Sequence, residues 1–467
     1  MCDIFNETKE IGDVDMNEIR DAIYGFITPN DTEMKIINTP VFQRLRRIRQ
    51  LAMAYLVYPG ANHTRFDHSL GVYHVAHLIA DKLLPGKDND ERRRLVRLAA
   101  LLHDIGHGPF SHTSEDLLNK FSRNSRNPED DNKIHELITA RLIENDKGLA
   151  YLLSPQDKEH VIGLLQGTKV DLTLMKHIVS GPLDADKMDY LLRDSHFCGV
   201  KYGVFDLDRV INTIDTYEDQ HDRDISIKYD GINSLEQFVL AKYYMITQVY
   251  FHKVRRVSDA MIVRGIELGI EQDKLKFLES LFCYEDSDEY LSRYLTYWDD
   301  RLVAEIMESK GKYARYYFDR LYHRRLFKKV FSRKLDELNI QNKLMQDKIL
   351  EINSKDNASL KEKLEQEISG IRLLECEKEY VIFNCVSIKS VKEMSRDSEG
   401  SIAVKDEYDR VSSFEQESTV FRAIDESLKD IYVEAYAPLE YIDPKDKQKK
   451  LASLEKDITK IIEEKGE

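Results

Sequence analysis

The amino-acid sequence predicts a mainly α-helical protein with a small α+β region near its C-terminal end. Apolar residues recur at helical spacing from residue 40 to about residue 335, and Gly and Pro fall between the apolar segments. Runs of β-branched and aromatic residues, which are typical of strands, follow at 380–386, 402–404 and 431–436. We therefore expect an N-terminal arm at 1–39, a helical core at 40–335 and a C-terminal region at 336–467.

The N-terminal arm has short polar and apolar segments with turn signals at Gly25 and Pro29. The first strongly patterned helix of the core is predicted over residues 95–102, because four apolar residues there recur at offsets 0, 3, 4 and 7 and define one buried face. Glycines follow closely and end this helix. His103 and Asp104 therefore lie in its last turn.

Two further helices of the core carry polar side chains on one face. One begins after Asn62 and places Arg65 one turn before His68. The other covers the segment GPLDADKMDYLLRDSHF, in which Asp186 lies four residues before Tyr190. Both faces present side chains suited to metal ligation or phosphate binding. A simple solvated face is the alternative, since Asp and Lys are common on exposed helices.

The C-terminal region begins with a stretch rich in Lys, Glu, Gln and Leu at 339–374, where Leu360, Leu364 and Ile368 recur every four residues. We expect one long, exposed amphipathic helix, whose charged face is either solvated or an oligomer contact. The three strand-like runs should form one small sheet, with a helix around 421–428. The last 25 or so residues, rich in Lys and Glu, predict a terminal helix or tail.

Composition excludes several classes of protein. The 467 residues amount to about three domains' worth of chain, and a hydrophobic content of 42% excludes global disorder. No apolar stretch approaches the length that a membrane span requires, and the N-terminus lacks a signal-peptide pattern. The five cysteines are scattered, odd in number and never spaced as CxxC, which indicates reduced thiols in the cytoplasm.

The net charge of -15 argues against a broad basic face for duplex nucleic acid. A polyanionic substrate therefore needs a locally basic pocket or a metal ion. Four arginines between residues 44 and 49 could form a local patch for single strands or nucleotides, although a structural and effector-binding helix is the favoured interpretation.

Histidines crowd into one quarter of the chain, where eight of the 14 lie between residues 63 and 135. The pair His103 and Asp104 offers adjacent nitrogen and oxygen ligands at the end of a packed helix. A second such pair at His221 lies in a polar run without an apolar helix, and we attribute it to chance. Around the first pair, the string LLHDIGHGPFSH adds His107 and His112 on a glycine-containing turn, where backbone can approach a ligand closely.

The ordered set His68, then His103 with Asp104, then Asp186 resembles the H…HD…D signature of HD-domain metal-dependent phosphohydrolases. The strings FQRLRRIRQL, YPGANHTRFDHSLGV, LLHDIGHGPFSH and DADKMDYLLRDSHFCG look like the deoxynucleoside triphosphate triphosphohydrolase branch, as do DAIYG and RLYHRRLFKKV. The resemblance covers about residues 17 to 335 and is weaker in the C-terminal sheet. It implies a helical HD-domain core, and no SAM domain is expected in the short arm.

The resemblance implies a role for each matching residue. The metal ligands for one divalent ion (Fe, Mn, Mg or Zn) would be His68, His103, Asp104 and Asp186. The catalytic group near the α-phosphate would be His107, His112, Glu115 and His135, where the family usually has Asp in place of Glu115. Phosphate contacts would come from Arg65, Lys187 and Tyr190, sugar contacts from Gln50, Leu51 and Asp194, and the 2′ position would face Tyr250. Lys242 replaces an Arg and keeps its charge without the bidentate fork.

The implied reaction converts a dNTP into a deoxynucleoside and tripolyphosphate, in nucleotide-pool control or antiviral defence. Two alternatives remain open. HD sites also cleave cyclic nucleotides and oligonucleotides, so a phosphodiesterase or nuclease is possible, with His107, His112 and His135 holding a second metal. A regulatory or nucleic-acid-binding module with a vestigial site is the other. The DAIYG segment, the arginine helix and the long helix from Asn339 suggest a homo-oligomer, dimer or tetramer, with effector nucleotide sites between subunits. No membrane partner is expected, because no apolar stretch is long enough to span a bilayer.

Overall fold

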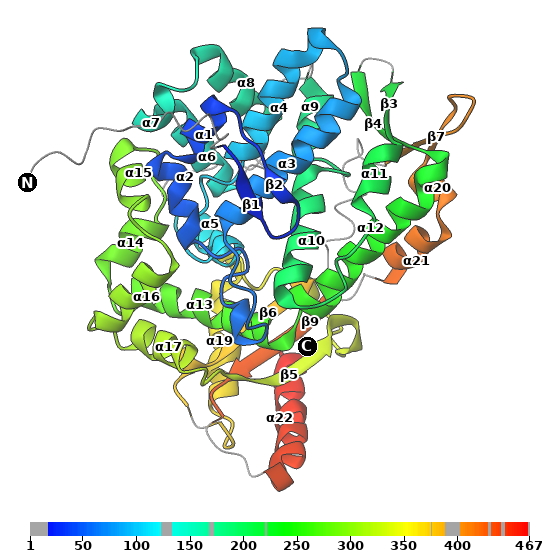
Figure 1. Ribbon diagram of the computed structural model, residues 1–467. Helices are drawn as coiled ribbons and strands as arrows, with labels where there is room; N and C mark the ends of the chain where they lie inside the picture. Colours follow the sequence, from blue (N-terminus) through cyan, green and yellow to red (C-terminus); the bar gives the residue numbers. More distant parts are fainter. Residues whose placement is uncertain are drawn as a thin grey trace, which may run out of the picture.

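The chain is mainly α-helical, which confirms the predicted fold class (Figure 1). A computed structural model describes residues 17–122, 133–167, 172–219, 222–374, 376–387, 402–427, 431–439 and 444–465. Within these residues, no helix is long and apolar enough to cross a membrane. The four cysteines in the described part of the chain are free thiols.

The helical core contains seventeen helices in the described residues, and one large apolar cluster runs through it. Their bounds are α1 (Asp31–Ile37), α2 (Pro40–Gln43), α3 (Arg65–Leu83), α4 (Asp90–Leu102), α5 (Glu115–Phe121), α6 (Ile134–Asn145), α7 (Lys147–Ala150), α8 (Pro155–Gln166), α9 (Thr173–Val179), α10 (Ala185–Cys198), α11 (Leu207–Thr213), α12 (Ile232–Tyr244), α13 (Lys253–Glu271), α14 (Lys276–Phe282), α15 (Asp288–Tyr294), α16 (Asp299–Glu308) and α17 (Tyr313–Tyr322).

Helices α3, α4 and α10 pack together at the centre of this core. The predicted apolar face of α4 is buried as expected, with Leu98, Ala99 and Leu102 at most 1% exposed, and His103 caps the helix. Helix α3 approaches α10 closely at Gly71, where any side chain would run into Asp189. The three helices therefore bring their polar ends to one place.

The N-terminal segment forms a hairpin of β1 (Ile19–Asp21) and β2 (Gly25–Ile27). Gly25 has a φ of 80°, a conformation that glycine adopts at little cost. The Asp21 carboxylate accepts hydrogen bonds from the backbone N–H groups of Ile23 and Tyr24 and so closes the turn. Helix α1 then buries Ile36 in the core, so part of the predicted arm packs with the helical core.

The expectation of a single small sheet is wrong, because the three predicted C-terminal strands are divided between two different sheets (Figure 1). The first sheet has the order β3-β4-β7-β8, with β7 parallel to β4. The second has the antiparallel order β5-β9-β6. The strand bounds are β3 (Ile214–Asp219), β4 (Asp222–Lys228), β5 (Lys328–Lys334), β6 (Ile382–Ser387), β7 (Ala403–Lys405), β8 (Val411–Ser413) and β9 (Ile431–Ala437).

The two sheets separate because their strands bury side chains in different cores. Val404 of β7 packs into the main core beside Ile227 of β4, whereas Phe383 of β6 and Val433 of β9 pack into a second core. Strands β3 and β4 lie within the region expected to be helical. They were not predicted, because most of their residues are polar and hide the strand pattern. His221 lies outside the described residues.

The single long, exposed helix predicted at 339–374 is also wrong. The structure has α18 (Lys343–Leu350) and α19 (Ala358–Ser369), separated by a turn in which the Asn357 side-chain amide donates to the Glu351 carbonyl. The break lets both helices bury apolar faces, through Ile349 and Leu364, in the second core.

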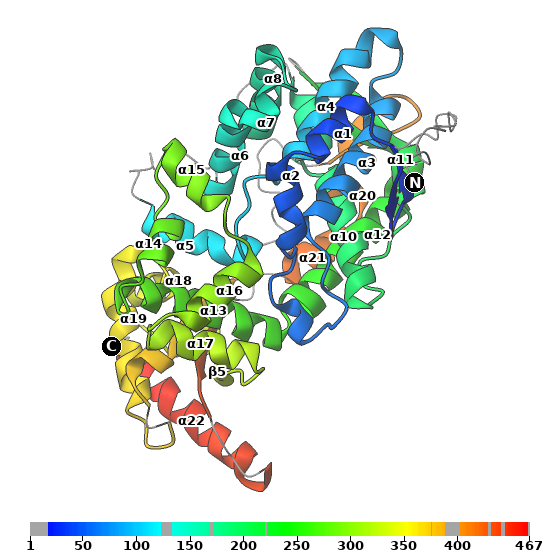
Figure 2. The same ribbon diagram turned by 60° about the vertical axis from the view of Figure 1, so that its left-hand side comes forward.

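The rest of the C-terminal region follows the prediction more closely. Helix α21 (Thr419–Ser427) matches the helix expected around 421–428, and it follows the short α20 (Phe414–Glu417). Helix α22 (Pro444–Glu464) is the expected terminal helix, and it packs against α19 (Figure 2). The second core thus lies at one end of the molecule, away from the polar ends of α3, α4 and α10 (Figures 1 and 2).

Candidate metal centre and active site

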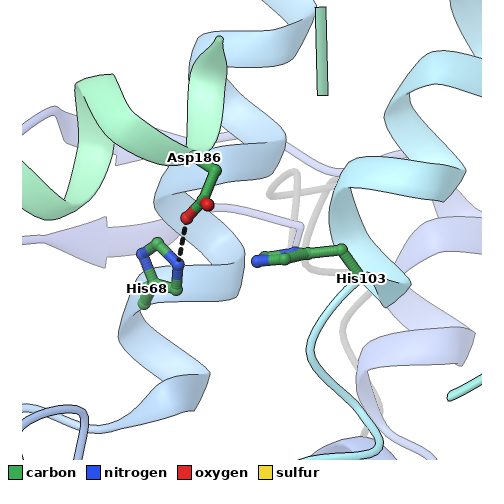
Figure 3. Close-up of side chains that lie close together, drawn as sticks. All are labelled: His68, His103 and Asp186. Atoms are coloured by element: carbon green, nitrogen blue, oxygen red, sulfur yellow. Dashed lines mark ion pairs between the residues drawn. The ribbon is translucent and has the colours of Figure 1, made fainter. Parts of the chain in front are cut away.

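Four predicted metal ligands meet where α3, α4 and α10 converge. His68 lies in the first turn of α3, His103 caps the C-terminal end of α4 with Asp104 directly after it, and Asp186 lies in the first turn of α10. Figure 3 shows the side chains of His68, His103 and Asp186 pointing toward one another. The capped helix ends therefore set the positions of all four residues.

The distances suit one metal ion. His68 Nε2 lies 3.0 Å from Asp186 Oδ1 and 3.7 Å from Asp104 Oδ2, and His103 Nε2 lies 3.3 Å from Asp104 Oδ1. One ligand atom each from His68, His103 and Asp186 falls within 4.8 Å of the other two. The Nε2 atoms of both histidines are buried and face carboxylate oxygens. Two buried imidazole nitrogens facing carboxylates fit a divalent cation of the Fe, Mn, Mg or Zn group.

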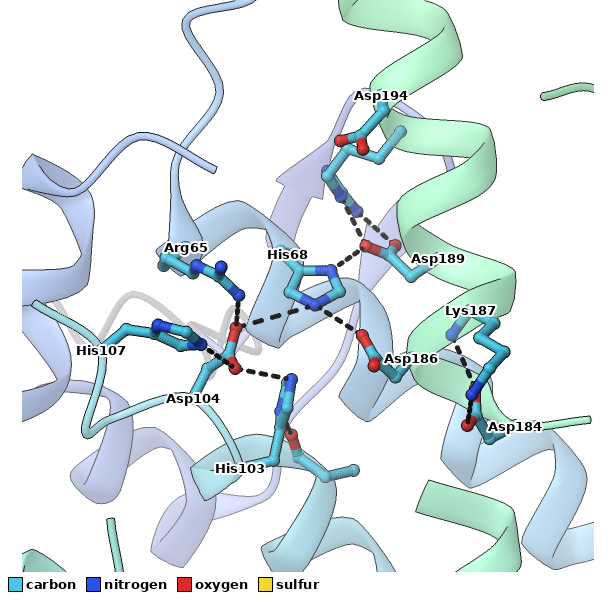
Figure 4. A network of polar contacts seen from close by, with 12 residues as sticks. Arg65, His68, His103, Asp104, His107, Asp184, Asp186, Lys187, Asp189 and Asp194 are labelled. Carbon is cyan, nitrogen blue, oxygen red and sulfur yellow. Dashed lines mark hydrogen bonds and ion pairs between the residues drawn. The ribbon is translucent and has the colours of Figure 1, made fainter. Parts of the chain in front are cut away.

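The ring of His68 is held from its other side. Its Nδ1 lies 2.8 Å from Asp189 Oδ2, and Asp189 in turn accepts two hydrogen bonds of 2.9 Å from Arg193 (Figure 4). Because Asp189 accepts from Nδ1–H, the Nε2 lone pair of His68 is directed at the metal position. Sequence reasoning missed Asp189 and Arg193, although their spacing of four residues on one helix face is a detectable signal.

Neighbouring charges in this centre shift the pKa values of His68 and Asp104 strongly. Burial lowers the pKa of His68, but hydrogen bonds with Asp186 and Asp189 outweigh burial and raise it to about 10. The Asp104 carboxyl is buried, yet the Arg65 guanidinium holds its pKa well below the usual range. The carboxylates therefore attract positive charge to this point, and a divalent cation can replace the proton that His68 otherwise carries.

Arg65 joins the metal centre to the loop that follows α4. Its Nη1 donates to Asp104 Oδ2 at 2.6 Å and its Nε donates to Ser111 Oγ at 3.0 Å. Its Nη2 is buried and has no hydrogen-bond partner. A guanidinium that is fixed on two sides and unpaired on the third is suited to bind an anionic oxygen of a ligand.

The four predicted catalytic residues form a second group beside the metal centre. The rings of His107 and His135 stack at a centroid distance of 3.9 Å, and His112 lies edge-on to His107 at 4.9 Å. His135 Nδ1 lies 2.8 Å from Glu115 Oε2. His107 Nε2 lies 3.3 Å from Asp104 Oδ1, which connects the two groups.

The pKa values of His107 and Glu115 are both lowered, which leaves His107 neutral and Glu115 negatively charged near pH 7. Burial and the Arg65 guanidinium lower the pKa of His107 well below its usual value, so this ring is neutral near pH 7. Burial raises the pKa of Glu115, but the hydrogen bond with His135 dominates and brings it to about 2. His107, Glu115 and His135 also bring ligand atoms within 4.8 Å of one another, which is compatible with a second metal ion.

The predicted sugar contacts gather at the other end of α10. Tyr250 ends a π-helical turn at Met245–Tyr250, and its hydroxyl donates to Asp194 Oδ2 at 2.6 Å. Asp194 Oδ1 lies 2.7 Å from His63 Nε2, a partner that sequence reasoning did not assign. The Oε1 atom of Gln50 is buried without a hydrogen-bond partner, which leaves it available to a sugar hydroxyl. Leu51 is buried in the core.

The remaining predicted substrate residues are placed less directly. The Lys187 ammonium donates to Asp184 Oδ2 at 2.6 Å and to the Gly181 carbonyl at 2.8 Å, so a phosphate contact needs a rotamer change. The Tyr190 ring lies 6.3 Å from the Tyr250 ring, edge to face. Lys242 is buried in α12. Their substrate roles stay predictions.

Comparison with protein families finds matches to two segments of the chain. Residues 65–191 match the HD domain, and residues 205–457 match the HD associated region, which spans more than half of the chain. The chain belongs to the HD-domain family. The predicted HD-domain core is thereby confirmed, and the HD domain contains every predicted metal ligand and catalytic residue.

The HD-domain protein resembles several curated proteins over part of their length. It is 38% identical over 260 residues to an uncharacterized protein of Methanocaldococcus jannaschii, covering 56% of this chain and 51% of that protein. It is 31% identical over 358 residues to deoxynucleoside triphosphate triphosphohydrolase SAMHD1 of Homo sapiens, covering 68% of this chain and 55% of that protein. The chain thus spans about half the length of the curated relatives it matches.

Solved structures resemble the HD-domain protein over almost its whole length. A hypothetical protein from Aquifex aeolicus is 30% identical with a TM-score of 0.68, and the match covers 94% of this chain and 99% of that one. A phosphohydrolase from Bacteroides thetaiotaomicron has the same TM-score at 24% identity, covering 90% and 99%. At that lower identity the likeness concerns the fold alone.

Proposed function

We propose that this HD-domain protein is a metal-dependent phosphohydrolase that cleaves dNTPs into deoxynucleoside and intact tripolyphosphate. The observation that supports the proposal is the contact of 3.3 Å between Asp104 Oδ1 and His107 Nε2, because it joins the four candidate acid–base residues to the candidate metal ligands. The similarity to the deoxynucleoside triphosphate triphosphohydrolase of Homo sapiens supports the choice of substrate.

Different residues would bind the metal, the phosphates and the sugar in the proposed reaction. His68, His103, Asp104 and Asp186 would hold one divalent ion, which supplies Lewis-acid activation of the α-phosphate when bound. The unpaired Nη2 of Arg65 binds a phosphate oxygen, and Tyr190 with a reoriented Lys187 adds further contacts. The sugar lies between Gln50 with Leu51 and the pair Tyr250 and Asp194, and Lys242 adds positive charge.

Hydrolysis then requires attack of water on the α-phosphorus and cleavage of the bond to the 5′ oxygen. The leaving 5′ oxygen takes up one proton and becomes the nucleoside hydroxyl, while the attacking water loses a proton. His112, neutral His107 and His135 are the groups placed to move these protons. Glu115 orients His135 through the bond to Nδ1. Tripolyphosphate leaves intact, because no bond between phosphates breaks.

A product assay tests the proposed function. The purified protein is incubated with each dNTP and Mn²⁺ or Mg²⁺, and ion-exchange chromatography separates the products. We expect deoxynucleoside and tripolyphosphate in equal amounts, loss of activity in His103→Ala, and full activity in the control His160→Ala on α8, outside both groups. Release of pyrophosphate or orthophosphate in place of tripolyphosphate would overturn the proposal.

One observation favours a second candidate, a phosphodiesterase or nuclease. The group of His107, Glu115 and His135 is compatible with a second metal ion, and a pair of metals is the usual device for cleaving phosphodiesters. Hydrolysis of a cyclic nucleotide or of single-stranded nucleic acid, with two metal ions per chain, would support this candidate. A homo-oligomer, an effector nucleotide and a cytoplasmic location remain predictions that accompany the first proposal.

A further inference from the structure

The loop that carries His107 and His112 has an unfavourable backbone conformation. Phe110 and Ser111, two consecutive residues with side chains, have φ angles of 64° and 52°. Residues other than glycine rarely adopt this left-handed region, and two in succession persist only where surrounding contacts hold them. The loop therefore depends on bonds from outside its own sequence.

Asp299, the first residue of α16, supplies one of these bonds and bonds the Arg49 segment as well. Its Oδ1 accepts a hydrogen bond of 2.8 Å from the Phe110 backbone N–H, and its Oδ2 accepts one of 3.0 Å from the Arg49 backbone N–H. The carboxylate is 1% exposed, so water does not compete for these donors. One buried carboxylate thus ties the histidine loop to the segment that continues into Gln50.

Other bonds join the same two segments. The Ser111 hydroxyl donates to the Arg49 carbonyl at 2.8 Å, so both backbone groups of Arg49 are held by the loop or by Asp299. On the far side of the loop, Arg44 Nη1 donates to the His107 carbonyl at 2.7 Å. The Tyr294 hydroxyl, on the helix before Asp299, donates to the Gly106 carbonyl at 3.0 Å. The histidine loop, residues 106–112, is therefore held by hydrogen bonds at Gly106, His107, Phe110 and Ser111.

We propose that Asp299 is a positioning residue of this active site: it fixes the left-handed turn that carries His107 and His112 and sets its register against Gln50. Asp299 lies far from the HD motif in sequence, and within the described part of the chain no hydrogen bond or ion pair joins its side chain to a predicted metal ligand. The inference rests on the proposed function only for the substrate used in the kinetic assay.

The neighbouring residue provides a matched control. Asp300 also bonds Arg49, through Nη1 at 3.0 Å, but its side chain is 74% exposed and does not touch the histidine loop. In Asp299→Asn, one carboxylate oxygen becomes an NH₂ group, which faces a backbone N–H and cannot accept its hydrogen bond. Asp300→Asn removes an acidic group of the same type from the solvent-exposed side of Arg49.

The experiment compares the two variants by kinetics, by metal content and by NMR of protein labelled at histidine Cε1. For Asp299→Asn we expect kcat for dNTP hydrolysis to fall 10- to 100-fold with metal content unchanged. The ring signals of His107 and His112 should shift or broaden, while those of His68 and His103 stay in place. Asp300→Asn should match the unmodified protein in every measurement.

A second variant, Ser111→Ala, distinguishes a local effect on the histidine loop from a general folding defect caused by Asp299→Asn. Ser111→Ala leaves Asp299 intact and removes two bonds, the one from the loop to the Arg49 carbonyl and the one that Ser111 Oγ accepts from Arg65 Nε. We therefore expect the ring signals of His107 and His112 to change in the same way as in Asp299→Asn, by a smaller amount. The proposal is overturned if Asp299→Asn behaves like Asp300→Asn, or if Ser111→Ala changes neither kcat nor the His107 signal. If the unmodified protein hydrolyses no dNTP, the proposed function fails, and the ring signals still decide the role of Asp299.

Discussion

Substitution of Glu115 by Gln removes a charge from the histidine group while keeping the shape of the side chain. The Glu115 carboxylate accepts from His135 Nδ1 at 2.8 Å, and its own pKa is lowered from 4.5 to about 2. This lowering of the pKa corresponds to about 3 kcal/mol of folding stability at a pH at which the carboxyl is ionised in both the folded and the unfolded chain. A glutamine oxygen still accepts the bond, but a neutral acceptor is worth about half as much as a charged one.

The sign of the pH dependence follows from the lowered pKa of Glu115. Because the carboxyl is more acidic in the folded protein, its contribution is fully present above pH 4.5 and is lost as pH falls toward 2. We therefore expect Glu115→Gln to be less stable by about 1 to 2 kcal/mol at pH 7, with a lower Tm by a few degrees. The gap between the two proteins should narrow as pH falls below 4.5.

The assay for Glu115→Gln combines thermal unfolding at pH 7 and pH 4 with dNTP turnover and metal analysis. We expect kcat to fall about 10- to 100-fold, because the negative charge that supports proton transfer through His135 is gone, while the metal stays bound. His160→Ala, on α8 and outside both residue groups, is the control and should change neither Tm nor kcat. A Glu115→Gln protein with unchanged Tm and unchanged kcat would refute the assignment of Glu115 as the charged partner of His135.

Two further substitutions test the support of the metal and the selection of the sugar. Asp189→Asn should weaken metal affinity about 10- to 100-fold, because it disturbs the bond that orients the His68 ring. Titration with a metal indicator measures the affinity, and an unchanged value would contradict the orienting role of Asp189. Tyr250→Ala should lower the preference for dATP over ATP, measured as the ratio of their kcat/KM values, by up to about 100-fold. Tyr250→Phe keeps the ring and loses only the bond to Asp194, so its ratio should stay near that of the unmodified protein. A Tyr250→Ala protein with an unchanged ratio and a lower Tm would show that the ring is only part of the core.

The fold was predictable where one residue pattern fixes one local structure. Helix α4 has apolar residues at offsets that only a helix brings to one face, and glycines end it, so its position and its capping His103 follow from sequence. The α18–α19 segment failed because the same apolar spacing fits one helix or two, and the choice depends on the second core. The parallel pairing of β7 with β4 joins segments far apart in sequence, which local patterns do not report.

The candidate site was predictable to a similar extent. The candidate ligands His68, His103 and Asp186 could be named because their positions at helix ends and their resemblance to the HD motif point to the same residues, whose side chains the structure brings together. The residues that hold them in place were missed. Asp189 is one of three acidic residues on α10, and its spacing from Arg193 does not reveal that it also bonds His68. Asp299 bonds backbone groups that any residue type would offer, so the sequence around Phe110 holds no sign of it.

Anomalous X-ray scattering from crystals grown with Mn²⁺ tests the central claim most directly, because it counts the metal ions and locates them in one measurement. The account predicts one strong peak per chain, bounded by His68, His103, Asp104 and Asp186, and no peak in crystals of His103→Ala. The control variant His160→Ala should keep the peak. A peak of equal strength between His107, Glu115 and His135, or the absence of any peak near His68, would contradict the claim of a single-metal phosphohydrolase centre.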